Sequence, residues 1–221
     1  EIRDQARPWE TPRTLLMQAL WGNGFSHPGG ADFALYIAKP LALNSALTVI
    51  DLSAGLGGGA RAVAEKFDVW ITGLEEDEQL ASAGMEQSHL AGMGKTVPIG
   101  RYAPANCAFQ PSSRDCMVAR ELFFRINDRK RLFAQIANGL KTGGQMIFTD
   151  YATRDGKSAL HPAIVEWIKA EELTHAPWTV EDVGVVLAGA KLECRVKEDI
   201  TDRYRAMVFD AWSAYAKQVK K

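Results

Sequence analysis

Leu47-Thr-Val-Ile-Asp-Leu-Ser-Ala-Gly-Leu-Gly-Gly-Gly-Ala-Arg61 is the stretch of sequence that decides the fold. Its apolar, β-branched beginning stops at Asp51, four glycines follow from Gly55 to Gly59, and a helix-like pattern then begins. Glycine lacks a Cβ, so it adopts positive φ angles and lets the backbone approach a ligand closely. Free N–H groups at the start of a helix add a partial positive field. Strand, glycine turn and helix start, in this order, predict a nucleotide-binding corner.

The spacing of these glycines separates two classes of ligand. A dinucleotide fingerprint needs Gly-x-Gly-x-x-Gly, whereas the residue three positions after Gly57 is Ala60, which disfavours an NAD-dependent enzyme. Asp51 and Gly55-Leu-Gly57 instead form Asp-x-x-x-Gly-x-Gly, which resembles motif I of the class I S-adenosylmethionine (SAM) methyltransferases. SAM carries a carboxylate and an ammonium, which suit glycine N–H groups and a nearby acid. An ordinary glycine-rich turn is the alternative interpretation.

The composition describes a chain with one sizeable core and no strong net charge. With 221 residues, 47% of them apolar, the chain can bury such a core as one domain. The net charge is −1, and because phosphate binding needs a basic face, nucleic acid is not an expected partner. No apolar run is long enough for a membrane span. Three widely spaced cysteines, Cys107, Cys116 and Cys194, indicate reduced thiols, and without a signal-peptide pattern we expect a cytoplasmic protein.

Strand-like apolar runs alternate with helical periods along most of the chain. This alternation predicts an α/β fold, a doubly wound, mostly parallel Rossmann-like sheet with helices on both faces. Right-handed crossovers then place the carboxyl ends of the strands, and any ligand, at one edge. The expected strands are 48–51, 68–74, 96–99, 115–120, 145–151 and 191–200, and the expected helices are 14–21, 31–41, 60–67, 79–90, 127–140 and 203–219. Little room is left for a further C-terminal strand.

An acidic residue ends the second expected strand. In a parallel sheet this place lies one strand away from the glycine turn, where a carboxylate can accept hydrogen bonds from two ribose hydroxyls. Glu75 holds that place. The acids that follow it, Glu76 to Glu78, are explained by favourable charge in the first turn of the next helix.

With these motifs in place, the chain resembles the class I SAM-dependent methyltransferases, and among them it is most similar to the phosphoethanolamine N-methyltransferases. The resemblance covers roughly residues 20 to 202 in the same order. It is carried by Trp21-Gly-Asn-Gly-Phe-Ser-His-Pro-Gly-Gly30, 49–59, 71–75, 115–121, Leu140-Lys-Thr-Gly-Gly-Gln-Met-Ile-Phe-Thr-Asp-Tyr151 and 179–182.

The resemblance implies SAM as the cofactor, S-adenosyl-L-homocysteine (SAH) as its product, and a set of residues that bind them. Gly55 and Gly57 would face the methionine part and Glu75 the ribose, and Arg120 would line the cofactor edge. The segment from Phe25 to Gly30 would form part of a lid. The expected cofactor-binding residues are Phe25, Asp51, Ser53, Gly55, Gly57, Glu75, Tyr102 and Arg120.

Three departures from the family limit what the resemblance implies. The acid that often lies beside the adenine amino group is absent from residues 100–103, where Tyr102 is hypothesised to stack on the adenine ring instead. The family's catalytic histidine appears as Arg125, which cannot act as a base. The basic, tyrosine-rich region that would hold a phosphate is replaced around residues 167–178. Phosphoethanolamine is therefore not carried over as the substrate.

Methyl transfer is an in-line displacement, so the enzyme mainly positions the reactants and excludes water. A base is needed only if the acceptor must lose a proton, and the candidates are His27, Tyr151 and His175. The sequence predicts a SAM-dependent methyltransferase acting on a small-molecule acceptor, with amines among the candidates, and no metal site. Arg125 and the missing adenine acid support the alternative, a non-catalytic SAM- or nucleoside-binding protein or a subunit of a larger assembly.

The chain is expected to divide into two parts. Residues 1–45 would form an N-terminal arm and lid helices, and residues 46–221 the SAM-binding domain with an acceptor-side insert around 152–178. An open sheet edge or an uncovered stripe on helix 203–219 would favour a homodimer.

Overall fold

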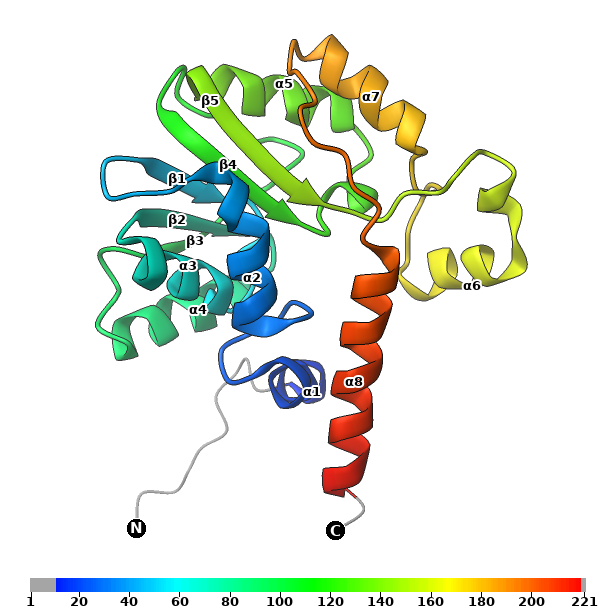
Figure 1. Ribbon diagram of the computed structural model, residues 1–221, viewed down its shortest axis with the longest axis horizontal. Helices are drawn as coiled ribbons and strands as arrows, with labels where there is room; N and C mark the ends of the chain where they lie inside the picture. Colours follow the sequence, from blue (N-terminus) through cyan, green and yellow to red (C-terminus); the bar gives the residue numbers. More distant parts are fainter. Residues whose placement is uncertain (1–10, 220–221) are drawn as a thin grey trace.

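A five-stranded parallel sheet forms the centre of the computed structural model, which describes residues 11–219 (Figure 1). The strand order is β3-β2-β1-β4-β5. The central strand is therefore β1, with β2 and β3 on one side of it and β4 and β5 on the other. The predicted α/β Rossmann-like fold is confirmed. The strands are β1 (Thr48–Asp51), β2 (Trp70–Glu75), β3 (Ile99–Arg101), β4 (Arg114–Arg120) and β5 (Leu140–Thr149).

Several helices begin at a residue whose side chain accepts a hydrogen bond from a backbone amide of the first turn. Asp77 accepts a hydrogen bond from the Leu80 amide at the start of α4, and Thr179 and Asp182 form a reciprocal capping box at α7. The helices are α1 (Pro12–Trp21), α2 (Gly30–Ala38), α3 (Gly58–Phe67), α4 (Glu78–Leu90), α5 (Arg129–Gly139), α6 (Pro162–Ala170), α7 (Val180–Gly189) and α8 (Thr201–Val219), with short 3-10 turns η1 (Lys39–Leu41), η2 (Phe123–Arg125) and η3 (Ser158–Leu160).

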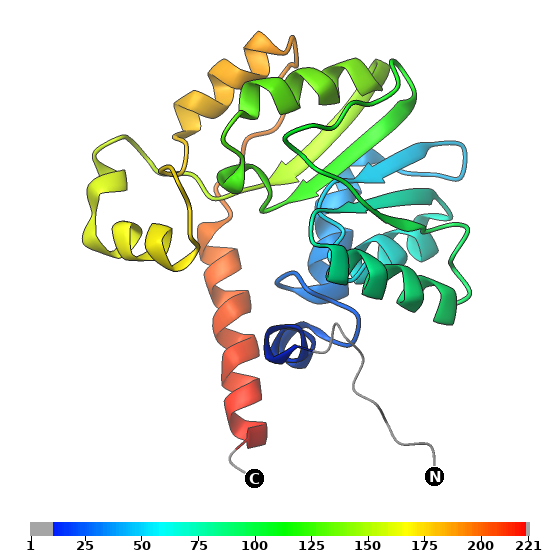
Figure 2. The same cartoon turned by 180° about the vertical axis from the view of Figure 1, so that it is seen from behind.

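The two faces of the sheet are covered differently. Val49 of β1 packs into a core formed with α2 and α3, whereas the next residue, Ile50, faces the core formed with α5 and α7. On this second face the connection from β3 to β4, residues 102–113, contains no helix and crosses the sheet as an irregular segment (Figure 2). The β1–β2 side of this face is therefore covered by a loop alone.

The expected strand at 191–200 is wrong. This segment is an irregular, mostly exposed connection between α7 and α8, and within residues 11–219 the sheet ends at β5. Its alternating pattern carries charged side chains at 193, 195, 197, 198 and 199. Because β propensity largely reflects packing against neighbouring strands, a strand-like pattern without such packing does not form one.

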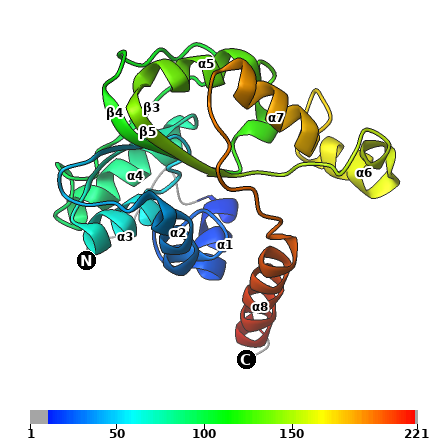
Figure 3. The ribbon, with the colours of Figure 1, turned by 45° about the horizontal axis from the view of Figure 1, so that its top comes forward.

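Helix α8 runs alongside α1 and points away from the sheet (Figures 1 and 3). At its start the Arg203 guanidinium lies 4.1 Å from the centre of the Tyr36 ring, and the Tyr36 hydroxyl donates to Glu198 at 3.4 Å. None of the helices in residues 11–219 has the length and apolar character to span a bilayer.

Candidate functional site

The glycine turn between β1 and α3 takes a backbone course that only glycine adopts without strain. Gly55 and Gly57 have φ angles of 54° and 78°. A Cβ at Gly55 would also overlap the Ser26 hydroxyl, and a Cβ at Gly57 would lie 2.7 Å from the Arg61 guanidinium. The turn therefore needs glycine at both positions, for its backbone and for the close approach of its neighbours.

Glu75 meets this turn directly. Its carboxylate accepts a hydrogen bond of 2.7 Å from the Gly55 amide and one of 3.0 Å from the Asp77 amide. Burial raises the pKa of Glu75, and these backbone hydrogen bonds oppose that rise. The structure thus brings together the glycine turn and the acid that the sequence assigns to one ligand.

The loop between α1 and α2, residues 22–29, lies on the turn, and we call it the lid segment. The Leu56 amide donates to the Ser26 hydroxyl at 3.1 Å, and the Gly58 amide donates to the Gly24 carbonyl at 2.9 Å. The Phe25 ring packs on the backbone of Gly58, where a Cβ would lie 2.8 Å from its Cδ1. The sequence predicts residues 25–30 as part of a lid but does not single out Ser26, because the bond joins residues 30 positions apart.

Three of the expected cofactor residues form one buried network beneath the turn. The Asp51 carboxylate accepts a hydrogen bond of 3.0 Å from the Ser53 amide and lies 3.6 Å from the Arg120 guanidinium. The Ser53 hydroxyl accepts a hydrogen bond of 2.7 Å from the Arg120 amide. A Cβ at Gly59 would lie 2.5 Å from the guanidinium, so glycine leaves room for it. This network joins the ends of β1 and β4.

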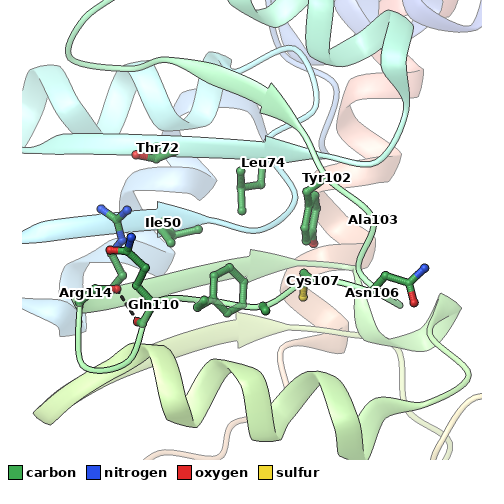
Figure 4. A pocket seen from close by; sticks show the side chains of 12 residues that line it. Ile50, Thr72, Leu74, Tyr102, Ala103, Asn106, Cys107, Gln110 and Arg114 are labelled. Carbon is green, nitrogen blue, oxygen red and sulfur yellow. Dashed lines mark hydrogen bonds between the residues drawn. The ribbon is translucent and has the colours of Figure 1, made fainter.

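Tyr102 spans the ends of two neighbouring strands. Its amide donates to the Glu75 carbonyl at 3.0 Å, and its hydroxyl donates to the Leu52 carbonyl at 2.6 Å. Burial raises the pKa of the Tyr102 phenol. The ring lies beside the glycine turn, at one end of a cavity on the sheet face (Figure 4), and stacking on adenine stays a prediction.

His27 lies in the lid segment next to Ser26. Its Nδ1 is 3.3 Å from the Ser26 hydroxyl. Burial, followed by the positive charges of Arg120 and Arg125, holds the pKa of His27 well below its ordinary value. The imidazole is therefore neutral near pH 7 and a weak base.

Two phenols hold a carboxylate at the end of β4. Glu121 follows this strand with a φ angle of 51°, and its side chain accepts hydrogen bonds from Tyr204 at 2.9 Å and from Tyr151 at 3.2 Å. The two phenol oxygens are 2.7 Å apart. Burial raises the pKa of Glu121, while its hydrogen bonds and the nearby arginines oppose the rise. The candidate base Tyr151 thus lies in a three-membered cluster with two residues that sequence analysis did not single out.

Three further aromatic rings pack around Tyr151. The Tyr151 ring lies 5.0 Å from Phe124, 5.4 Å from Trp167 and 5.9 Å from Tyr204, measured between ring centres. We call these four side chains the aromatic cluster. They come from η2, the end of β5, α6 and α8, so separate parts of the chain build one site. Glu121 could have been predicted as a site residue from its position at the end of a strand, whereas nothing in the sequence indicated that Tyr204 contacts it.

His175 lies on the other side of η2 and is held by the backbone there. Its Nε2 donates to the Phe124 carbonyl at 2.9 Å, and its Nδ1 lies 3.4 Å from the Thr174 hydroxyl. Burial, followed by the charge of Arg129, lowers the pKa of His175. Nearby, Arg125 forms an ion pair of 2.9 Å with Glu171. In residues 11–219 no group of three His, Cys, Asp or Glu side chains has the arrangement to hold a metal ion.

Several buried polar atoms near the end of β5 have no hydrogen-bond partner among the described residues. They include both carboxylate oxygens of Asp150, the Thr149 hydroxyl and Nε1 of Trp178. Burial raises the pKa of Asp150 to about 7, whereas hydrogen bonding of less than full geometry to the Phe124 and Tyr151 amides and the charge of Arg129 oppose the rise. Buried polar atoms without a partner are uncommon in protein interiors.

Comparison with known proteins finds relatives among the phosphoethanolamine N-methyltransferases, which the sequence motifs also resemble. No family model matches the chain. A phosphoethanolamine N-methyltransferase of Triticum aestivum is 26% identical over 193 residues, and phosphoethanolamine N-methyltransferase 3 of Arabidopsis thaliana is 27% identical over 193 residues. Each match covers 86% of this chain, and 36% and 38% of the relatives, so the chain spans less than half the length of these relatives.

A solved structure shares the fold. Haemonchus contortus phosphoethanolamine N-methyltransferase 2, in complex with phosphomonomethylethanolamine and SAH, superposes with a TM-score of 0.85 at 21% identity. The match covers 95% of this chain and 49% of that chain. The chain has the class I methyltransferase fold and is similar in sequence to phosphoethanolamine N-methyltransferases.

Proposed function

We propose that this chain is a SAM-dependent methyltransferase that transfers a methyl group to a small-molecule acceptor bearing an amine. The observation that carries the proposal is the 2.7 Å hydrogen bond between the Gly55 amide and the Glu75 carboxylate. It places backbone donors and a carboxylate at one corner, at the carboxyl ends of β1 and β2. The similarity to methyltransferases in sequence and fold supports the same activity.

The corner fits an amino-acid-bearing adenosine by its chemistry. Glu75 retains lone pairs that can accept hydrogen bonds from ribose hydroxyls, and the turn has no side chain at Gly55 or Gly57 to block a ligand. The Ser26 hydroxyl accepts a hydrogen bond from the Leu56 amide, so this amide is not free to bind a ligand in the present conformation. We infer that the lid segment moves when the cofactor's amino-acid end binds, so that this amide turns to the ligand.

The acceptor-side residues fit a cationic amine. The Glu121 carboxylate supplies negative charge, and the Tyr151 and Trp167 rings supply aromatic surface that favours ammonium groups. The neighbouring Phe124 ring already has the Arg125 guanidinium 5.0 Å from its centre. Where the resemblance expects a catalytic histidine, Arg125 is paired with Glu171. Because Glu171 offsets the charge of Arg125, we infer an acceptor without a phosphate group.

SAM, when bound, supplies an electrophilic methyl group on sulfur. The acceptor amine must lose its proton before its lone pair can form the new N–C bond, and the S–C bond breaks as that bond forms, releasing SAH. We assign the proton acceptor to Glu121, which Tyr151 and Tyr204 hold in place by hydrogen bonds. His175 is less suited, because its Nε2 donates to the Phe124 carbonyl. His27 is also less suited, because it lies next to Ser26 in the lid segment, where burial and nearby arginines lower its pKa.

Calorimetry and a transfer assay test the proposal. We expect SAH to bind, NAD not to bind, and labelled methyl to pass from SAM to one member of a mixture of small amines. SAH binding without transfer to any acceptor would favour the non-catalytic alternative, and absence of SAH binding would overturn both. Unchanged SAH binding by Gly57→Val would show that the assignment of the turn is wrong.

We further propose a cytoplasmic protein that self-associates through α8. Phe209 and Trp212 of this helix are 71% and 46% exposed, and β5 is an edge strand within the described residues. Sedimentation of the wild-type chain and of Phe209→Ser at several concentrations tests the association. A monomer at every concentration would refute it.

A further inference from the structure

A cavity of about 490 Å³ lies on the sheet face that carries α5, and we call it the side cavity (Figure 4). Binding sites for small molecules commonly have volumes of a few hundred Å³. Neither Glu121 nor any member of the aromatic cluster lines this cavity. It is therefore separate from the acceptor-side residues described above.

The side cavity exists because a loop, not a helix, covers β1 and β2 on this face. Helix α5 holds that loop in place: the Arg131 guanidinium donates to the Cys107 carbonyl at 3.3 Å, and the Asn138 amide group donates to the Phe109 carbonyl at 3.3 Å. The Ser112 amide donates to the Asn138 carbonyl at 2.9 Å. The loop is thus bonded to α5, so the wall of the cavity is a built part of the fold.

The lining combines an apolar wall with a polar end. Ile50 and Leu74 point into the cavity from β1 and β2, whereas Gln110 and Arg114 lie at one end (Figure 4). Phe109 of the loop also lines it. Among residues 11–219, no acidic side chain lines the cavity, and Arg114 supplies the one formal charge in its lining.

Arg114 has no counter-ion among the residues that the structure describes. Its Nε is buried without a hydrogen-bond partner. The adjacent acid, Asp115, is occupied elsewhere: its carboxylate accepts hydrogen bonds of 2.9 Å from Lys141 and 2.7 Å from the Thr48 hydroxyl. A buried guanidinium donor without a partner is costly, and carboxylates and phosphates are the groups that satisfy it best.

We propose that the side cavity binds a small anionic ring compound, in which a carboxylate or a phosphomonoester is attached to a flat apolar ring. Arg114 holds the anion, and the ring lies against Ile50, Leu74 and Phe109. The cavity volume and the lining both match this class of ligand.

The other end of the side cavity is formed by Tyr102, whose hydroxyl bonds to the Leu52 carbonyl at the start of the glycine turn. A ligand in the cavity would therefore contact a side chain that also touches the cofactor corner. This link rests on the proposed function, and we expect an anion in the cavity to change the affinity for SAH.

Calorimetry on the full chain, with no cofactor added, tests whether the side cavity binds such a ligand. The probes are phenyl phosphate and benzoate, with benzamide as the neutral analogue and inorganic phosphate as the anion without a ring. The variant is Arg114→Gln, and the control is Arg101→Gln, an exposed arginine 3.1 Å from Glu78. Arg114→Lys, which keeps the charge, serves if Arg114→Gln does not fold by near-ultraviolet circular dichroism.

We expect phenyl phosphate or benzoate to bind about tenfold more tightly than benzamide and inorganic phosphate. Arg114→Gln should weaken that binding about tenfold and Arg101→Gln less than about twofold, with Arg114→Lys in between. Equal binding by Arg114→Gln and wild type, or equal binding of benzamide and benzoate, would overturn the proposal. An SAH affinity that saturating phenyl phosphate leaves unchanged would overturn only the link through Tyr102, and loss of SAH binding in every sample would overturn the proposed function instead.

Discussion

The proposed cofactor corner and the end of β5 differ in how their buried polar groups are satisfied. At the corner, the amides of Gly55, Leu56 and Gly58 all donate to protein acceptors. At the end of β5, the Trp178 indole has no partner among the described residues. The Asp150 carboxylate there has no hydrogen bond of full geometry, although the Phe124 and Tyr151 amides are close enough to lower its pKa. A ligand that binds backbone amides at the corner must therefore replace an existing hydrogen bond, whereas the end of β5 has buried polar atoms without one. A buried polar group without a hydrogen bond lowers stability.

Among the substitutions that test this difference, Asp150→Asn has the largest expected effect, a change in the free energy of unfolding. Burial raises the pKa of this carboxyl from 3.8 to about 7. Between these values the folded chain holds a proton that the unfolded chain has released, so stability falls as the pH rises from about 4 to about 7. Asparagine removes this fall, and at pH 8 the variant should be more stable than wild type by at most about 4 kcal/mol.

Denaturant unfolding between pH 4 and 8 measures this effect, and Asp115→Asn is the matched control of opposite sign. Hydrogen bonds from Lys141 and Thr48 hold the pKa of Asp115 at about 2, so its contribution to stability is present above pH 4 and is lost as the pH falls through 2. Asp115→Asn should therefore destabilise the protein at neutral pH. If the free energy of unfolding of Asp150→Asn depends on pH as it does in the wild type, our account of the buried carboxyl group at the end of β5 is wrong.

Gly55→Ala has the next largest expected effect, a loss of SAH affinity, and tests whether the glycine turn binds the cofactor. The added Cβ would overlap the Ser26 hydroxyl and strain a φ angle of 54°, and we expect SAH affinity to fall about 100-fold. Gly92→Ala is the control, because Gly92 has a similar φ angle of 72° with open space around it. Both variants should lose about 1 kcal/mol of stability from backbone strain. Equal SAH affinities by calorimetry would contradict the assignment.

Glu75→Gln removes the charge at the corner but keeps the shape of the side chain. Loss of charge-assisted hydrogen bonds should weaken SAH binding about tenfold. Glu78→Gln, three residues further and exposed, should leave the affinity unchanged. If both variants bind SAH like the wild type, Glu75 has no part in holding the ribose.

Tyr204→Phe has the smallest expected effect and concerns the acceptor side. It deletes the hydroxyl that donates to Glu121 at 2.9 Å, so labelled-methyl transfer should slow about fivefold with SAH affinity unchanged. Tyr215→Phe on the same helix, where the ring packs against Trp212, should change neither quantity. A parallel loss of SAH affinity in Tyr204→Phe would mean that α8 supports the corner and not the acceptor.

The same comparison explains what could be predicted from the sequence. The corner was predictable because the glycine turn and Glu75 follow consecutive strands, and parallel topology alone places their ends side by side. The contact between Glu121 and Tyr204 joins residues 83 positions apart. Helical periodicity indicates which side of α8 is apolar but not which residues that side faces. The strand expected at 191–200 failed for the same reason, because pairing depends on a neighbour that the local pattern does not reveal.

The bond between Ser26 and the Leu56 amide has a kinetic consequence. A cofactor that needs this amide competes with the protein's own serine, so only the fraction of molecules with an open lid segment can bind it. The measured dissociation constant is then the intrinsic one divided by that fraction. At high cofactor concentration the association rate should level off at the rate of opening. In that range of concentration, we expect the opening of the loop between α1 and α2, and not diffusion, to limit the rate of cofactor binding.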